Sequence, residues 1–177
     1  MKLYIDCDGV IFDSEKLLFN EEYYGLKSLG KITCEKDKVE FIKNSDWNKI
    51  LRESEIINNS INILKSLRDF IILTKVNSLE NEAVEKIKRF RELGIDNDII
   101  FVPHSVKKTD VVDSFGNILI DDTIHNLDDW YNCGGIPIFF NKDNKDIDGW
   151  NRINIKYRKI SSLDEVHNIK KLIYEYK

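Results

Sequence analysis

The chain has 177 residues, of which 42% are apolar and 33% are charged, with only 8 glycines and 2 prolines. This composition excludes collagen, low-complexity disorder and a disulfide-stabilised miniprotein. The net charge is −4, from 27 basic and 31 acidic residues, and no sustained basic block is present. A large nucleic acid is therefore disfavoured as the main partner. Because no run of 18 apolar residues occurs, we also expect no membrane partner.

The N-terminus and the cysteines predict the compartment. Asp6 and Asp8 fall where the apolar core of a signal peptide would lie. Cys7, Cys34 and Cys133 are odd in number and have no paired spacing, which is typical of reduced thiols. We therefore expect a cytoplasmic protein.

The first predicted element is a short buried strand, Leu3-Tyr4-Ile5, which ends at Asp6. Residues 14 to about 61 then form a mostly helical block with polar turns. This block is too long for an ordinary crossover between neighbouring strands. We interpret residues 14–61 as a helical cap over one end of the sheet, and residues 1–13 and 62–177 as the core domain.

After the helical block, apolar strands alternate with helices. The predicted strands are Phe70–Leu73, Ile99–Val102, Ile118–Ile120 and Ile136–Phe140. This alternation predicts the α/β class, with a Rossmann-like core of three layers in which helices cover both faces of a parallel sheet.

Two of the later helices have recognisable starts. Asn77, with Glu80 three residues later, predicts a helix that presents Leu79, Ala83, Ile87 and Phe90 on its apolar face. The Glu- and Lys-rich face of residues 80–92 is predicted to be solvated. Ser162 and Glu165 predict the start of a last helix, whose apolar residues are Val166, Ile169, Leu172 and Ile173.

Polar side chains follow each of the first four strands of the core, at the edge where open α/β sheets bind ligands. They are Asp6, Asp8, Thr74, Lys75, His104, Lys107, Lys108, Asp121 and Asp122. Clustered carboxylates repel each other unless they are protonated or bind a cation, and oxygen ligands without a His/Cys set favour Mg²⁺ over zinc. A magnesium ion, a hydroxyl and a lysine together suit a phosphate group, so this edge predicts phosphoryl-transfer chemistry.

The spacing of Asp6 and Asp8 suits the same chemistry. One aspartate can attack phosphorus and form an aspartyl phosphate. The other, two residues later, can act as an acid for the leaving group and then as a base for water. A turn built on Asp8-Gly9 is the structural alternative for this pair.

Four segments resemble, in order, the motifs of haloacid-dehalogenase (HAD) superfamily phosphatases. They are Asp6-Cys7-Asp8-Gly9-Val10-Ile11-Phe12-Asp13, Leu73-Thr74, Lys108-Thr109-Asp110, and Ile118-Leu119-Ile120-Asp121-Asp122 with Asn126. The stretch ILIDDTIHNLDDWYNCGGIPIFF resembles the 5'(3')-deoxyribonucleotidase branch and its bacterial and phage relatives. Lys75 and Ser14 depart from the animal enzymes of that branch, which have a small hydroxyl residue and a base-stacking aromatic residue there.

The resemblance implies a Mg²⁺-dependent phosphomonoesterase that forms an aspartyl phosphate and acts on a small phosphorylated substrate, a nucleoside monophosphate. Asp6 would be the nucleophile and a metal ligand, and Asp8 the general acid and base, with its backbone carbonyl on the metal. Thr74 would bind phosphate, and Lys108, preferred over Lys107, would neutralise the nucleophile and the phosphate. Asp122 would be the main metal ligand of its motif, with Asp121 beside it.

Alternative functions remain in view. A receiver domain uses similar residues in another order on a shorter chain without a cap, and a DxD glycosyltransferase needs a nucleotide-binding half before its motif. A non-catalytic relative that binds phosphate or a protein, or a phosphatase of a non-nucleotide metabolite, is compatible with the same motifs. For the aromatic residues of the helical block, core packing is preferred to base stacking; these are Phe19, Tyr23, Tyr24 and Trp47.

Overall fold

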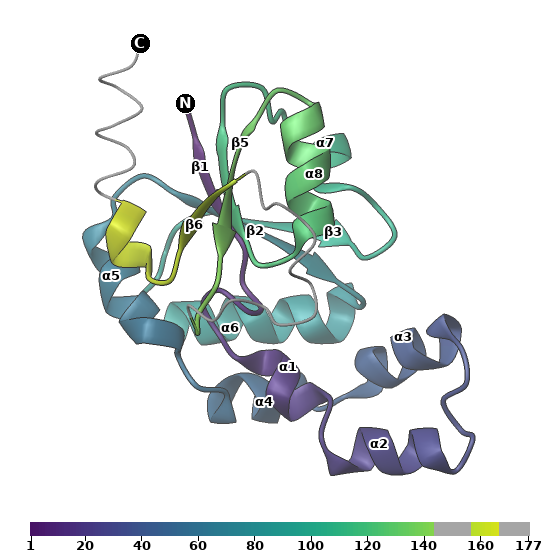
Figure 1. Cartoon of the computed structure of the whole chain (residues 1–177). Helices are drawn as coiled ribbons and strands as arrows, with labels where there is room; N and C mark the ends of the chain where they lie inside the picture. The colour runs from purple at the N-terminus through teal and green to yellow at the C-terminus, as the bar shows by residue number, and fades with distance from the viewer. Residues whose placement is uncertain (144–156, 167–177) are drawn as a thin grey trace.

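The computed structural model describes residues 1–143 and 157–166 of the chain (Figure 1). In this part of the chain, one sheet contains six strands in the order β3-β2-β1-β4-β5-β6, and every neighbouring pair is parallel. The strands are β1 (Leu3–Ile5), β2 (Ile71–Val76), β3 (Ile99–Pro103), β4 (Ile118–Asp121), β5 (Ile136–Phe140) and β6 (Arg158–Ile160). The predicted α/β class with a parallel sheet is confirmed, and β6 is an additional strand that the sequence pattern does not predict.

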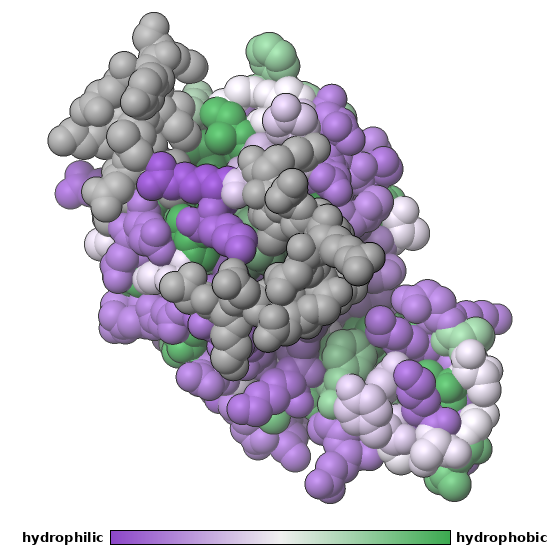
Figure 2. All heavy atoms as spheres, viewed as in Figure 1, coloured by the Kyte–Doolittle hydropathy of each residue, from purple (hydrophilic) through white to green (hydrophobic). Residues whose placement is uncertain are grey.

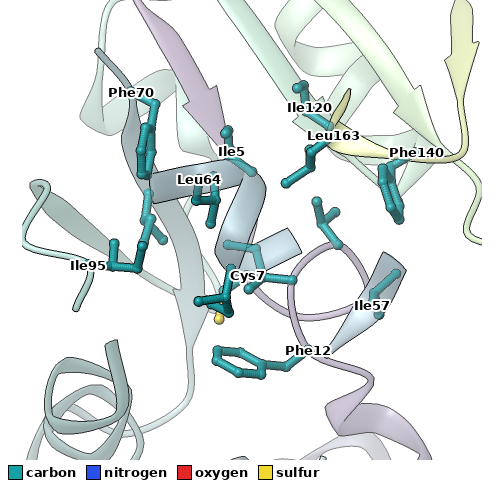
Figure 3. Close-up of a cluster of buried hydrophobic side chains, with 14 of the residues drawn as sticks. Ile5, Cys7, Phe12, Ile57, Leu64, Phe70, Ile95, Ile120, Phe140 and Leu163 are labelled. Carbon is teal, nitrogen blue, oxygen red and sulfur yellow. The ribbon is translucent and has the colours of Figure 1, made fainter. Parts of the chain in front are cut away.

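Helices cover both faces of the sheet, as Figure 1 shows. Alternate residues of β1 face opposite sides, so Ile5 joins one buried cluster and Tyr4 joins the other. The first cluster includes residues of α5 (Ser60–Ser66) and α6 (Val84–Glu92), and Figure 3 shows its members Ile5, Leu64, Ile120, Phe140 and Leu163. The second is completed by Leu127 and Trp130 of α8 (Ile124–Asn132), which packs beside α7 (Lys108–Val111).

Four helices and a 3₁₀ turn lie between β1 and α5. They are α1 (Ser14–Leu18), α2 (Glu21–Ser28), α3 (Glu35–Asn44), α4 (Trp47–Glu53) and η1 (Ile57–Asn59). The two ends of this insertion are joined by backbone hydrogen bonds, because Asp13 N–H donates to Glu55 O at 3.0 Å and Ile57 N–H donates to Ile11 O at 3.0 Å. The chain therefore leaves and re-enters the core at one place, while α2 and α3 project away from the sheet (Figure 1).

The segment after β2 differs from its prediction. Ser78, not Asn77, caps the helix, and its Oγ accepts from Asn81 N–H at 3.1 Å. The first turn, η2 (Leu79–Ala83), is a π turn, a wider turn that changes which residues of the following helix face the core. Glu82 and Lys86 are consequently buried, while Leu79 is 58% exposed. The prediction that the charged face of residues 80–92 is solvated is wrong at Glu82 and Lys86.

At the C-terminal side, Ser162 and Glu165 form the predicted capping box at η3 (Leu163–Glu165). The remaining apolar residues of the predicted last helix, Ile169, Leu172 and Ile173, lie outside the described residues.

Across residues 1–143 and 157–166, no helix is both long and apolar enough to cross a membrane. Among the residues that Figure 2 colours, most are hydrophilic, and apolar residues (green) are visible on the projecting α2–α3 pair.

Candidate active site

Asp6 lies at the carboxyl edge of the sheet, between β1 and β4. Its backbone N–H donates to Ile120 O at 2.9 Å, so the sheet pairing continues through Asp6 before the chain turns. The turn is closed by Ile11 N–H, which donates to Cys7 O at 2.8 Å. Cys7 itself belongs to the buried cluster of Figure 3, whereas Asp6 and Asp8 line a cavity. Burial raises the pKa of the Cys7 thiol well above its ordinary value, which suits a packing role.

Lys108, the first residue of α7, connects two aspartates. Its Nζ lies 2.5 Å from Asp6 Oδ1 and 2.6 Å from Asp121 Oδ2, and the residue is 2% exposed. Burial alone would lower the pKa of Lys108, but Asp121 and Asp6 together raise it, so the lysine stays charged. This ammonium therefore fixes the orientation of Asp6.

Three carboxylates form a cluster beside this lysine. One oxygen from each of Asp6, Asp121 and Asp122 lies within 4.8 Å of the others. Burial raises the pKa of Asp6 to about 7, with Lys108 opposing this and Asp121 and Asp8 adding to it. Partial burial, together with repulsion from Asp121 and Asp6, raises the pKa of Asp122 well above its ordinary value. A cation between these oxygens would remove the repulsion.

The surrounding chain is shaped to allow this cluster. Gly9 has φ = 75°, and a Cβ at this position would lie 1.9 Å from Asp122 Oδ2. Glycine is therefore needed for Asp122 to approach the turn after β1. Asp121 is oriented by the side-chain amide of Asn126 at 3.1 and 3.2 Å and by Thr123 N–H at 2.8 Å. All the donor atoms are carboxylate oxygens, and the local backbone holds them close together. These residues therefore fit Mg²⁺.

Asp8 has different partners from Asp6. Its Oδ1 accepts from Ser14 Oγ at 2.5 Å, and its Oδ2 lies 2.5 Å from Lys86 Nζ. Lys86 Nζ is also 3.4 Å from the hydroxyl of Thr74, at the end of β2. The two aspartates that follow β1 are thus held by two separate lysines, one from α7 and one from α6.

A cavity of about 540 Å³ lies between the strand ends and the inserted helices, within the range of about 300–1,000 Å³ typical of small-molecule sites. The core contributes Asp6, Asp8, Thr74, Lys75 and Asp122. The insertion contributes the apolar and aromatic residues Leu18, Phe19, Ile42 and Trp47, together with the polar residues Ser14, Glu15 and Lys38. Lys38 Nζ lies 5.3 Å from the centre of the Phe19 ring. The apolar part of the cavity lining therefore comes mainly from the insertion, while the strand ends contribute polar and charged side chains.

The structure brings the predicted site residues Asp6, Asp8, Thr74 and Asp122 to this cavity, with Lys108 directly behind Asp6. Lys107 also lines the cavity, but its Nζ pairs with Asp129 Oδ1 at 2.8 Å and its side chain is 54% exposed. The sequence does not predict that Lys86 and Glu82 lie at the site, because a lysine four residues after a glutamate resembles an exposed helix pair. The π turn that buries this pair leaves no signal in the apolar pattern.

The aromatic residues of the insertion divide between packing and the cavity. Trp47 is buried, and its Nε1 donates to Ile42 O at 2.9 Å. Tyr23 packs against Phe19 and Phe41, and Tyr24 is exposed. Phe19 is therefore the aromatic residue of this group that both lines the cavity and remains partly exposed.

No family model and no curated protein sequence matches the chain. Solved structures do match along almost its entire length. A HAD hydrolase of family IA, variant 3, from Entamoeba histolytica has a TM-score of 0.66 at 15% identity, covering 98% of this chain and 99% of that chain. A hydrolase from Pseudomonas syringae has a TM-score of 0.65 at 12% identity, covering 97% and 98%.

The magnesium-bound HAD-hydrolase YfnB of Bacillus subtilis has a TM-score of 0.59 at 16% identity, covering 95% of this chain and 97% of that chain. The chain has the HAD-hydrolase fold. At these identities the likeness concerns the fold, and the function depends on the residues of the site.

Proposed function

We propose that the chain is a Mg²⁺-dependent phosphomonoesterase that forms an aspartyl phosphate on Asp6. The observation that carries this proposal is the pair of carboxylates, Asp6 and Asp8, which line one cavity but have separate partners. Asp6 is held by Lys108 beside two further carboxylates, as suits a nucleophile next to a cation. Asp8 is held apart from that cluster, as suits an acid and base.

The reaction divides into two steps. An oxygen of Asp6 attacks phosphorus while the bond to the leaving oxygen breaks, and Asp8 delivers a proton to that oxygen. Asp8 then takes a proton from a water molecule, whose oxygen attacks the phosphorus of the aspartyl phosphate. Inorganic phosphate leaves and the Asp6 carboxylate is restored. Lys108 offsets charge on the phosphate, and the Thr74 hydroxyl binds one of its oxygens.

Asp6, Asp121 and Asp122 would hold Mg²⁺ through their carboxylates, and Asp8 would contribute its backbone carbonyl. When bound, the ion supplies positive charge against the phosphate oxygens. The magnesium-bound state of YfnB, which shares the fold, supports this choice of metal.

For the substrate we propose a nucleoside monophosphate, in line with the resemblance of residues 118–140 to the 5'(3')-deoxyribonucleotidase branch. Phe19 is a partly exposed aromatic residue that lines the same cavity as Asp6 and Asp8, and its ring could contact a base. Burial and the neighbouring Lys108 lower the pKa of Lys75, which also lines the cavity. An ammonium in such a position gains from an anionic ligand, so Lys75 supports a phosphorylated substrate rather than a neutral one.

The test is phosphate release from a panel of nucleoside and deoxynucleoside 5'- and 3'-monophosphates, sugar phosphates and an aryl phosphate. We expect release with Mg²⁺ that is lost with EDTA and in Asp6→Asn. The matched control, Asp96→Asn, removes a carboxylate that is 89% exposed and lies outside the four motifs, and it should keep full activity. Equal release by wild type and Asp6→Asn would contradict the proposal. Phosphate binding without release by the wild type would instead favour a non-catalytic relative.

A further inference from the structure

Lys86 and Glu82 form a charged pair inside the protein, next to the proposed acid and base. Lys86 is 0% exposed and Glu82 is 2% exposed. We propose that Lys86 is a positioning residue that holds the Asp8 carboxylate in place for proton transfer, and that Glu82 holds Lys86. This inference rests on the proposed phosphatase function and adds two residues to its machinery.

The contacts leave Asp8 little freedom. Lys86 Nζ lies 2.5 Å from Asp8 Oδ2 and 2.8 Å from Glu82 Oε1. On the other side of the carboxylate, Ser14 Oγ donates to Oδ1 at 2.5 Å. Because each oxygen of Asp8 has its own donor, both its position and its rotation are fixed.

Glu82 is in turn fixed to the end of β2. Its Oε2 accepts from the backbone N–H of Asn77 at 2.8 Å, one residue after the strand ends. The π turn η2 places Glu82 directly over this N–H, and Lys86 follows one turn later on the same side of the helix. Asp8 is therefore connected through two buried side chains to the backbone of the sheet, which is a rigid support.

A purely structural explanation of this pair is weak. Burying two charges costs more than burying apolar groups of the same size, and cores often gain stability when such a pair is replaced by apolar residues. Here Lys86 contacts the carboxylate of Asp8, which lines the cavity, so the positive charge of Lys86 lies next to the site. A role in holding Asp8 in a reactive orientation explains why a charged residue, Lys86, occupies this buried position.

The same lysine also meets the inserted helices. Its Nζ lies 5.1 Å from the centre of the Trp47 ring, at the start of α4. Asn48 and Arg52 of α4 bond to Glu85 and Glu92 of α6, at 2.8 and 2.5 Å. Helix α6, which carries Lys86, thus contacts the insertion that contributes the apolar lining residues of the cavity.

The experiment compares two kinds of substrate, since proton donation matters for a poor leaving group and little for a good one. We expect Lys86→Met to lower kcat for an alkyl phosphate by about 10²–10⁴-fold. For p-nitrophenyl phosphate we expect less than about a tenfold loss, with KM little changed for both. Lys86→Arg should restore part of the alkyl activity. The matched control is Lys88→Met, which removes an exposed lysine of the same helix and should match wild type.

A general loss of folded protein would lower both activities by the same factor, so equal losses on the two substrates would overturn the inference. So would a Lys86→Met variant that behaves like Lys88→Met. If Lys86→Met does not fold, the double variant Lys86→Met/Glu82→Gln removes both buried charges and should show the same dependence on the leaving group.

A second measurement does not depend on turnover. Urea unfolding of Asp8→Asn, Lys86→Met and the combined variant Asp8→Asn/Lys86→Met should give non-additive losses in the unfolding midpoint, with the combined variant losing less than the sum of the two single variants. Additive losses would show that Lys86 and Asp8 do not interact, and this would overturn the inference. A wild-type chain that releases no phosphate would contradict the proposed function, while this unfolding cycle would still decide whether Lys86 holds Asp8.

Discussion

Lys108 Nζ lies 2.5 Å from Asp6 Oδ1, although 102 positions separate the two residues in the sequence. Its neighbour Lys107 pairs instead with Asp129, and the Lys107 side chain is 54% exposed at the edge of the cavity. Two adjacent lysines at the start of α7 therefore have different surroundings, and this difference can be tested directly.

Lys108→Met should lower kcat/KM by about 10²–10³-fold, because it removes a buried charge directed at the nucleophile and the phosphate. Lys107→Met removes an exposed ion pair and should change kcat/KM by less than about fivefold. Steady-state kinetics of both variants on one phosphomonoester measures the two losses and shows which lysine acts at the site. A larger loss in Lys107→Met than in Lys108→Met would show that the wrong lysine has been assigned.

Gly9→Ala should weaken Mg²⁺ binding by at least about tenfold, because the new Cβ would displace the Asp122 carboxylate. The matched control is Gly116→Ala, which has a similar φ of 65° but open space around the Cβ. Both variants should lose about 1–2 kcal/mol of stability from the left-handed backbone. Calorimetric titration with Mg²⁺ should find weakened binding in Gly9→Ala alone, and equal affinities in the two variants would refute this explanation of Gly9.

Mg²⁺ should stabilise the protein more at high pH than at low pH. The pKa of Asp6 is raised to about 7 in the folded chain from about 3.9 in an unfolded chain. Its contribution to stability is therefore present below about pH 4 and is lost as the pH rises through about 7. A cation replaces the proton, so the gain in Tm on adding Mg²⁺ should be larger at about pH 8 than at about pH 5.

Thermal unfolding with and without Mg²⁺ at these two pH values measures the gain. Asp122→Asn, which lacks one carboxylate of the cluster, is the control and should show a smaller gain at the higher pH. A gain that is equal at both pH values, or larger at low pH, would argue against cation binding by this cluster.

The buried pair of Glu82 in η2 and Lys86 in α6 makes a separate prediction about stability. Lys86→Met should lower the free energy of unfolding by about 3–5 kcal/mol, because it leaves Glu82 buried without its partner. Adding Glu82→Gln removes the unpaired charge and should recover more than half of this loss. Urea unfolding provides the measurement, and a double variant that is less stable than Lys86→Met would show that Glu82 is stabilised by other groups.

The strands of the core were predictable because a parallel strand covered on both faces is a short apolar run that ends in polar residues. Ile118–Ile120 followed by Asp121 is an example, and it matches β4 to within one residue. By contrast, β6 begins with the exposed residues Arg158 and Lys159, so no apolar run marks it. The α/β class could therefore be predicted from sequence, while one edge of the sheet could not.

The predicted site residues lie together because each motif follows a strand, and the carboxyl ends of parallel strands share one edge of the sheet. The order of motifs and strands in the sequence is therefore enough to predict this placement. Their chemical roles remain predictions. Lys86 and Glu82 were assigned to a solvated helix face, since burial here depends on a π turn and on the tertiary position of Asp8. The local sequence predicts neither the π turn nor the position of Asp8.

The central claim is that Asp6 accepts the phosphoryl group. The most direct measurement is rapid acid quenching of the enzyme during turnover of a phosphomonoester with Mg²⁺, followed by mass spectrometry of the peptide that contains Asp6 and Asp8. We predict one added phosphoryl group on Asp6, absent when EDTA is present and absent in Asp6→Asn. Turnover by the wild type with no phosphoryl group on Asp6, or with the group on another residue, would contradict the mechanism.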